Sequence, residues 1–209
     1  MTSASAPILR AGDRLSRPEF ERRYEEMAGL AKAELLFGVV VMPSPVRCRL
    51  HAEPHALLTH WLCHYQTLAG GTRVATDATV RLLPDTEVQP DLLLRRLDAQ
   101  GGSRLDADGY LSGAPELVVE VAASSAALDL TDKMQAYWRA GVREYVVVRP
   151  EVPCVDWFVW SERGYAARSP EADGCLGSAH WPGLRLDVAA LLRGDAAALV
   201  AAVPRGGSA

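Results

Sequence analysis

Residues 115–123 read PELVVEVAA and form the most strand-like stretch of the chain. Their β-branched apolar side chains would fill both faces of an extended segment, which is typical of a strand buried inside a sheet. Glu120 stands within this run, between Val119 and Val121. A carboxylate on a buried strand is costly unless it is paired or bound to a metal, so the sequence predicts a partner for Glu120.

A second acid stands at the mouth of another apolar strand, where Gln89-Pro90-Asp91 leads into Leu92-Leu93-Leu94. Two acids on adjacent strands that point the same way supply the oxygen ligands that Mg²⁺ or Mn²⁺ takes, with water completing the shell. The spacing is compatible with such a site but does not fix its geometry.

The segment after Glu120 predicts a helix in which Asp129, Lys133 and Tyr137 recur every four residues and share one face. A lysine beside two metal-bound acids could orient an attacking water, help to deprotonate it, and stabilise charge on phosphorus. This combination indicates phosphodiester hydrolysis. The alternative is a surface ion pair between Asp129 and Lys133, which would contribute little to stability.

The lysine content is unusual, because the chain has 20 Arg and only two Lys, Lys32 and Lys133. Each lysine is therefore a candidate for a position where a guanidinium would not serve.

The remaining pattern alternates helices and strands, without internal repeats or linkers. Helices are expected over residues 17–28, 54–69 and 126–140, and strands over residues 34–42, 73–83, 88–94, 144–149 and 154–160. Because Gly38 interrupts the first of these runs, residues 34–42 form either one strand or two strands joined by a turn, and residues 97–114 are expected to form a loop. We predict one α/β domain over residues 13–202, between flexible ends at residues 1–12 and 203–209.

Composition excludes several classes of protein. A chain of 209 residues with 49% hydrophobic content can bury a sizeable core, which excludes disorder as its main state. The net charge of −4 gives no footprint of a bulk nucleic-acid binder, so any DNA contact must be local. No apolar run suits a membrane span or a secretory signal, so we expect a cytoplasmic protein without a membrane partner. The four cysteines form no C-x-x-C pair and are expected to be reduced thiols.

An ordered series of motifs resembles the Uma2 family of restriction-endonuclease-like proteins, over about residues 16–192. The series comprises Glu34-Leu35-Leu36-x-Gly38, Met42-Pro43-Ser44-Pro45, His55, Val88-Gln89-Pro90-Asp91, Pro115 to Val121, Ser124-Ser125, Asp129, Lys133, Tyr137, Gly141-Val142 and Glu144-Tyr145. The resemblance implies the PD-(D/E)xK nuclease fold, a mixed central sheet flanked by helices.

The resemblance also implies roles for individual residues. Asp91 and Glu120 would be the metal-binding acids, and Glu34 would be an additional acid beside the site. The usual nuclease motif places its lysine two residues after the second acid, where this chain has Ala122, and Lys133 on the following helix takes that place. His55, Gln89, Asp129 and Tyr137 are expected to line the site, and dimerisation, which is common in this fold group, makes a homodimer an expected partner state.

Other metal patterns are weaker. His51 and His55, like His60 and His64, are four residues apart, as in helical zinc sites, but Pro54 interrupts the first pair and no suitably placed acid supports either. For the second pair we expect an exposed helix face.

The sequence therefore predicts a Mg²⁺- or Mn²⁺-dependent endonuclease acting on nucleic acid, with DNA as the expected substrate. Asp91, Glu120 and Lys133 would be catalytic, and Asp91, Glu120 and Glu34 would hold the metal. The alternative is a non-catalytic nucleic-acid-binding or assembly module that retains the nuclease fold. A third hypothesis is an enzyme for another phosphodiester or nucleotide.

Overall fold

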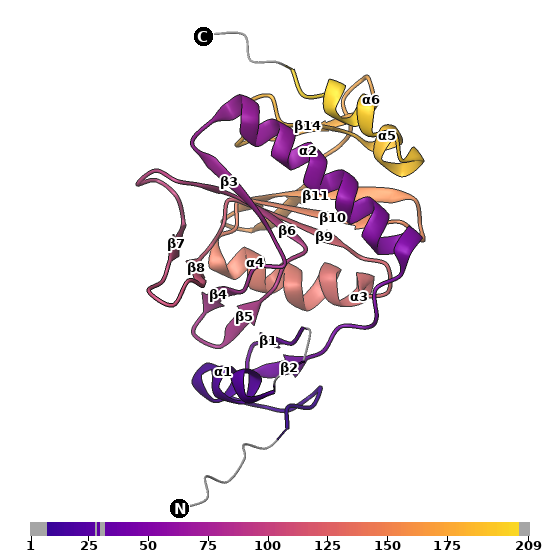
Figure 1. The fold of residues 1–209 in the computed structure, drawn as a ribbon. Helices are drawn as coiled ribbons and strands as arrows, with labels where there is room; N and C mark the ends of the chain where they lie inside the picture. Colours follow the sequence, from indigo (N-terminus) through magenta and orange to yellow (C-terminus); the bar gives the residue numbers. More distant parts are fainter. Residues whose placement is uncertain (1–7, 28, 30–31, 205–209) are drawn as a thin grey trace, which may run out of the picture.

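The computed structural model describes residues 8–27, 29 and 32–204 as a mixed α/β structure (Figure 1). The predicted flexible ends lie partly outside these residues. Of the described residues in these two segments, Leu9 and Val203 are buried, whereas Ile8 and Pro204 are exposed.

The central sheet has six strands in the order β12-β11-β10-β9-β6-β3. These strands are β3 (Thr72–Thr76), β6 (Leu92–Arg96), β9 (Leu117–Val121), β10 (Glu144–Arg149), β11 (Cys154–Ser161) and β12 (Gly164–Ala167). The β9–β10 pair is parallel and the other pairs are antiparallel. The sheet is therefore mixed, as the sequence predicts.

Helices cover both faces of this sheet (Figure 1). Helix α2 (Glu53–Ala69) packs on one face together with α5 (Val188–Arg193) and α6 (Ala196–Ala201). The other face is covered by α3 (Ala126–Leu128), the π-helical turn η2 (Asp129–Lys133) and α4 (Met134–Ala140). No helix in the described part of the chain is long and apolar enough to cross a bilayer.

Strand β9 divides its side chains between the two layers. Val119 and Val121 belong to the core beneath α2, whereas Val118 belongs to the core beneath α4. Because side chains alternate along a strand, Glu120 lies on the α4 side with Val118. The sheet therefore directs the carboxylate of Glu120 toward the segment that carries Lys133.

A second sheet lies beside the first and has the strand order β2-β1-β5-β4-β8-β7. Its strands are β1 (Glu34–Leu36), β2 (Val39–Val41), β4 (Val80–Leu83), β5 (Thr86–Val88), β7 (Ser103–Leu105) and β8 (Leu111–Gly113). Helix α1 (Arg17–Glu26) packs with β1 and β2 around Phe20, Leu35 and Val40.

The structure corrects several expected elements. The run 73–83 is divided between β3 and β4 in different sheets, and the loop expected over residues 97–114 contains β7 and β8. The sheet also continues past residue 160, with β12 at its edge. A small sheet of β13 (Cys175–Gly177) and β14 (Arg185–Asp187) follows, before α5 and α6. Most of these strands are three or four residues long, too short to show a periodic pattern.

Candidate active site

Glu120 is the centre of a buried charged cluster on the α4 side of the central sheet. Its Oε1 accepts hydrogen bonds from Lys133 Nζ at 2.8 Å and from the Tyr137 hydroxyl at 2.7 Å. Burial alone would raise the pKa of Glu120, but the nearby ammonium groups of Lys133 and Lys32 and the two hydrogen bonds lower it overall. Glu120 is therefore a carboxylate at neutral pH.

Lys133 joins three acids. Besides Glu120, its Nζ lies 3.1 Å from Glu34 Oε2 and 3.9 Å from Asp129 Oδ1. Only 4% of Lys133 is exposed, so the alternative of a surface ion pair with Asp129 is wrong. Burial alone would lower the pKa of Lys133, but Glu120, Glu34 and Asp129 raise it overall. Lys133 is therefore an ammonium ion at neutral pH.

Glu34 enters the cluster from β1, in the second sheet. One carboxylate oxygen contacts Lys133 and the other accepts a hydrogen bond from the Gln89 backbone at 2.7 Å. The side chain of Gln89 donates instead to Tyr24 and Thr79, at 3.2 and 3.1 Å. Gln89 thus contacts the charged cluster through its backbone N–H, whereas its side-chain amide lies outside the cluster.

Asp91 approaches Glu120 from the residue that immediately precedes β6. Its Oδ2 accepts a hydrogen bond from the backbone nitrogen of Val121 at 2.8 Å, and its own nitrogen lies 3.4 Å from Glu120 Oε2. Its Oδ1 lies 3.4 Å from Lys32 Nζ and 3.6 Å from His51 Nε2. Burial, followed by repulsion from Glu120, raises the pKa of Asp91.

Two histidines adjoin Asp91. His51, on the π-helical turn η1 (Cys48–Ala52), donates through Nδ1 to the carbonyl oxygen of Val121 at 3.0 Å, because a carbonyl can only accept. His55, on α2, donates through Nε2 to the carbonyl oxygen of Asp91, also at 3.0 Å. The two rings stack with centroids 6.0 Å apart. His55 is thus beside Asp91.

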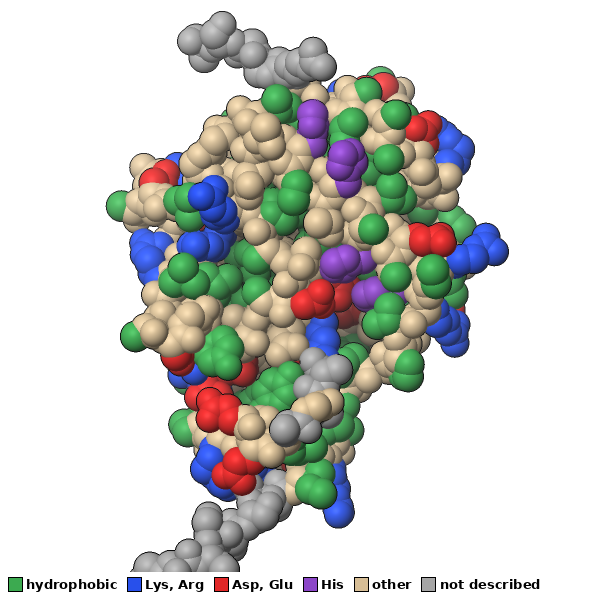
Figure 2. Space-filling model, viewed as in Figure 1, with side chains coloured by type: hydrophobic (Ala, Val, Ile, Leu, Met, Phe, Trp, Pro, Cys, Tyr) green, Lys and Arg blue, Asp and Glu red, His purple; other side chains and the backbone are tan. Residues whose placement is uncertain are grey.

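Asp77 lies beside the cluster on the turn between β3 and β4. Its carboxylate is 3.7 Å from both Lys32 Nζ and His55 Nε2, and more than half of its side chain is exposed. Figure 2 shows histidine, acidic and basic side chains gathered together on the face viewed, consistent with a site that reaches the surface here.

Asp129 has a separate environment at the first residue of η2. Its Oδ2 accepts a hydrogen bond from the Ser125 hydroxyl, and its backbone carbonyl accepts one from Tyr145 at 3.0 Å. Burial and the charge of Glu120 raise its pKa to about 7, although Lys133 acts in the opposite direction. The pKa of Asp129 is therefore close to neutral pH.

Sequence reasoning named most of these residues but missed Lys32, His51 and Asp77 as members of the cluster. The scarcity of lysine was the available signal, because both lysines of the chain contact its acids. His51 belongs to a four-residue histidine spacing, which by itself indicates only a possible zinc motif. Nothing in the sequence around Asp77 distinguishes it from other turn acids.

The number of available ligands in the charged cluster limits which metal ions it could bind. Among the residues with described positions, no group of three or more His, Cys, Asp or Glu side chains is arranged to hold a metal ion. Both oxygens of Glu34 are engaged, by Lys133 and by the Gln89 backbone, whereas Glu120 Oε2 has only the 3.4 Å contact with the Asp91 nitrogen and Asp91 Oδ1 faces Lys32 and His51. Two hard oxygen donors remain at Asp91 and Glu120, which fits the one or two carboxylates through which proteins commonly bind Mg²⁺.

The fold and the cluster define a class: a mixed α/β sheet flanked by helices, with acids from neighbouring strands gathered around a buried lysine. The family model of Uma2, described as "Putative restriction endonuclease", matches residues 17–189. The match covers most of the chain, and the protein belongs to the Uma2 family. This membership supports a nuclease-like function.

Among solved structures, the chain is similar to "a putative nuclease belonging to DUF820" from Anabaena variabilis. The TM-score is 0.65 with 13% sequence identity, over 86% of this chain and 98% of that chain. At this identity the similarity establishes the fold alone, and it confirms the predicted fold class. The search of curated proteins gave no match.

Proposed function

We propose that the protein is a metal-dependent endonuclease that hydrolyses phosphodiester bonds in DNA. One observation carries this proposal: Asp91 and Glu120, from neighbouring strands, meet beside both lysines of the chain. Membership of the Uma2 family also supports the proposal, because the residues that match the family model, 17–189, include every residue of the charged cluster.

Asp91 and Glu120 would hold Mg²⁺ or Mn²⁺, and water and substrate phosphate would complete the shell. The bound ion would polarise the phosphoryl group and lower the pKa of a bound water. The raised pKa of Asp91 supports this role, because a divalent cation would relieve the repulsion between it and Glu120.

Lys133 would orient Glu120 and stabilise negative charge on the phosphoryl oxygens. Its raised pKa argues against a role as a proton acceptor, because it remains an ammonium ion at neutral pH. Glu34 would hold Lys133 in place, since its contacts are to Lys133 and to the Gln89 backbone.

DNA contact would be local, as the net charge of −4 requires. Arg47 and Arg49 are exposed and precede His51 by four and two residues along the chain, so they would be candidates to contact phosphate near the site.

The test combines DNA cleavage with calorimetric titration of Mn²⁺. We expect wild-type protein to bind Mn²⁺ and to nick supercoiled plasmid, whereas Asp91→Asn and Glu120→Gln lose both. Asp132→Asn is the matched control, because Asp132 is an exposed acid next to Lys133 with no ion pair among the described residues.

Two outcomes would contradict the proposal. Failure of the wild-type protein to bind Mn²⁺ at millimolar concentration would favour the non-catalytic module. Cleavage that survives in Asp91→Asn or Glu120→Gln would instead place the active site elsewhere.

A further inference from the structure

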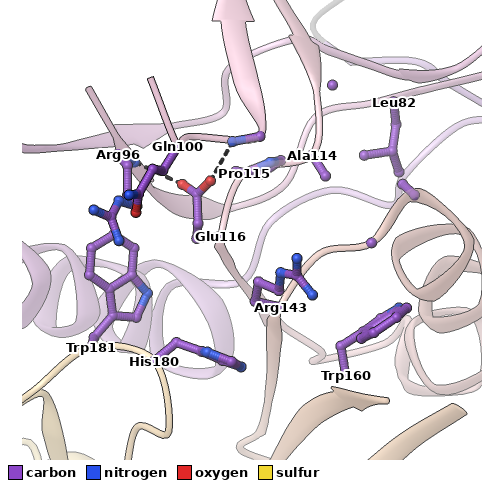
Figure 3. Close-up of a pocket in the computed structure, with 14 residues that line it drawn as sticks. Leu82, Arg96, Gln100, Ala114, Pro115, Glu116, Arg143, Trp160, His180 and Trp181 are labelled. Carbon is purple, nitrogen blue, oxygen red and sulfur yellow. Dashed lines mark hydrogen bonds between the residues drawn. The ribbon is translucent and has the colours of Figure 1, made fainter. Parts of the chain in front are cut away.

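A cavity of about 510 Å³ opens at the opposite end of β9 and β10 from the charged cluster. Glu116 and Arg143 line it just before these two strands begin, and Trp160, His180 and Trp181 complete its lower wall in Figure 3. We call it the distal cavity. Its volume lies within the range of about 300–1,000 Å³ that is typical of small-molecule sites.

The indole of Trp181 provides the first sign of a ligand. Trp181 is only 6% exposed, and its Nε1 has no hydrogen-bond partner among the described residues. The other four tryptophans all donate through Nε1: Trp61 to Arg185, Trp138 to Ser161, Trp157 to Glu144 and Trp160 to Trp138. A buried donor without an acceptor is costly, so the unpaired N–H of Trp181 suits an acceptor supplied by a bound molecule.

The charges around the distal cavity favour an anion. Its acidic lining residue, Glu116, is already satisfied, because its two oxygens accept backbone hydrogen bonds from Arg96 at 2.7 Å and Gly102 at 2.6 Å. The side chain of Arg143 is exposed, and its guanidinium has no carboxylate partner and no hydrogen-bond acceptor among the residues whose positions are known. The cavity therefore presents the guanidinium of Arg143, the unpaired N–H of Trp181 and a carboxylate whose oxygens already accept hydrogen bonds.

The same wall can also accept a flat ring. The guanidinium of Arg143 lies 5.3 Å from the centroid of the Trp160 ring, and Leu82 and Ala140 add apolar surface. An aromatic ring and an arginine are the groups on which nucleobases stack.

We propose that the distal cavity binds a small organic anion that carries a flat ring, of the class of a nucleoside monophosphate. Arg143 and the Trp181 N–H would bind the phosphate, and the base would pack near Trp160. This site is separate from the Glu120 cluster and does not depend on the nuclease proposal.

The test is calorimetric titration of the full chain with adenosine monophosphate, inorganic phosphate and adenosine as separate probes. We expect the monophosphate to bind most tightly, because only it supplies both the charge and the ring. Arg143→Gln should weaken its binding roughly tenfold or more, as expected for loss of a charge-assisted hydrogen bond. Trp181→Phe, which keeps an aromatic ring and removes the N–H, should weaken it several-fold.

Arg163→Gln is the matched control, because Arg163 is an exposed arginine that does not line the cavity, and it should bind like wild type. Trp181→Phe should also melt no lower than wild type, since the N–H that it loses has no partner in the free protein. Absence of monophosphate binding to wild type at millimolar concentration would overturn the proposal. So would equal affinity for the monophosphate in wild type and Arg143→Gln, or binding of inorganic phosphate as tight as that of the monophosphate.

Discussion

Each end of the β9–β10 strand pair carries a buried glutamate, but the groups that compensate the negative charge differ between the two ends. Glu144, fully buried, accepts hydrogen bonds from the Trp157 indole, the Ser178 hydroxyl and the backbone nitrogens of Ala179 and His180, at 2.7–3.0 Å. At the other end, Glu120 is balanced by the ammonium group of Lys133.

The difference separates a scaffold acid from a candidate functional acid. The donors to Glu144 are neutral and mostly fixed by the fold, so its carboxylate ties β10 to the chain before β14. The partners of Glu120 include a charged side chain, and burial together with repulsion from Glu120 raises the pKa of Asp91 beside it. Charge at the Glu120 end is therefore available to interact with an ion or a substrate.

The largest effect is expected from Lys133→Met, which removes the cation shared by Glu120 and Glu34. Leaving buried acids without their partner should lower the free energy of unfolding by about 3–5 kcal/mol. Urea denaturation at pH 7 measures the loss. The double variant Lys133→Met/Glu120→Gln should recover part of it, and a loss in the single variant below about 1 kcal/mol would contradict the assigned charge balance.

The pH dependence of stability tests the same cluster through Asp129. Its pKa is raised from an ordinary value of 3.8 to about 7, so the folded state binds a proton more tightly than the unfolded state. The resulting stabilisation is fully present below about pH 4 and is lost as the pH rises through about 7. Asp129→Asn should therefore remove most of this decrease in stability, which is on the order of 4 kcal/mol between these limits. Parallel stability profiles for the two proteins, from urea denaturation across this range, would refute the shifted pKa.

Glu144→Gln tests the scaffold end. The amide keeps one acceptor oxygen but turns a donor group toward donors that are already in place, so we expect a loss of about 2 kcal/mol in the free energy of unfolding. Mn²⁺ uptake by the folded variant should equal that of wild type. A change in Mn²⁺ affinity would break the distinction between the two ends.

The smallest effect is expected from Tyr137→Phe, which removes one hydrogen bond to Glu120 while Lys133 stays in contact. Loss of a hydrogen bond to a charged group should cost about 1.5 kcal/mol in thermal or urea unfolding. Tyr65→Phe is a useful control, because it removes a hydroxyl that donates to the carbonyl of Pro182, away from the charged cluster. Equal losses from the two variants would mean that the charge of Glu120 adds nothing to the bond.

Sequence reasoning anticipated the candidate cluster where local pattern was strong. The apolar run around Glu120 predicted a buried strand, and the four-residue spacing placed Lys133 and Tyr137 on one helix face. The structure brings both side chains to Glu120 even though Lys133 lies on a π-helical turn. Family resemblance, rather than periodicity, supplied Glu34.

The missed members come from segments that carry no periodic signal. Lys32 lies just before β1, and Asp77 has a left-handed backbone, with a φ of 50°, on the turn between β3 and β4. Lys32 is about 60 residues from Asp91 along the chain, and Asp77 is 14 residues from it. Strand pairing brings them together, which local sequence spacing cannot reveal. The short strands β7, β8, β13 and β14 were missed for a similar reason, since their partners define them.

The sequence by itself determined the layered α/β architecture, the burial of Glu120 and its need for a cation, because hydrophobic periodicity and the cost of a buried charge act locally. Only the tertiary structure decided that both lysines meet the acids, that Glu34 binds Lys133, and that Trp181 keeps an unpaired N–H in the distal cavity. These contacts join residues that are remote along the chain, and the packing of sheets and helices fixes which of them meet.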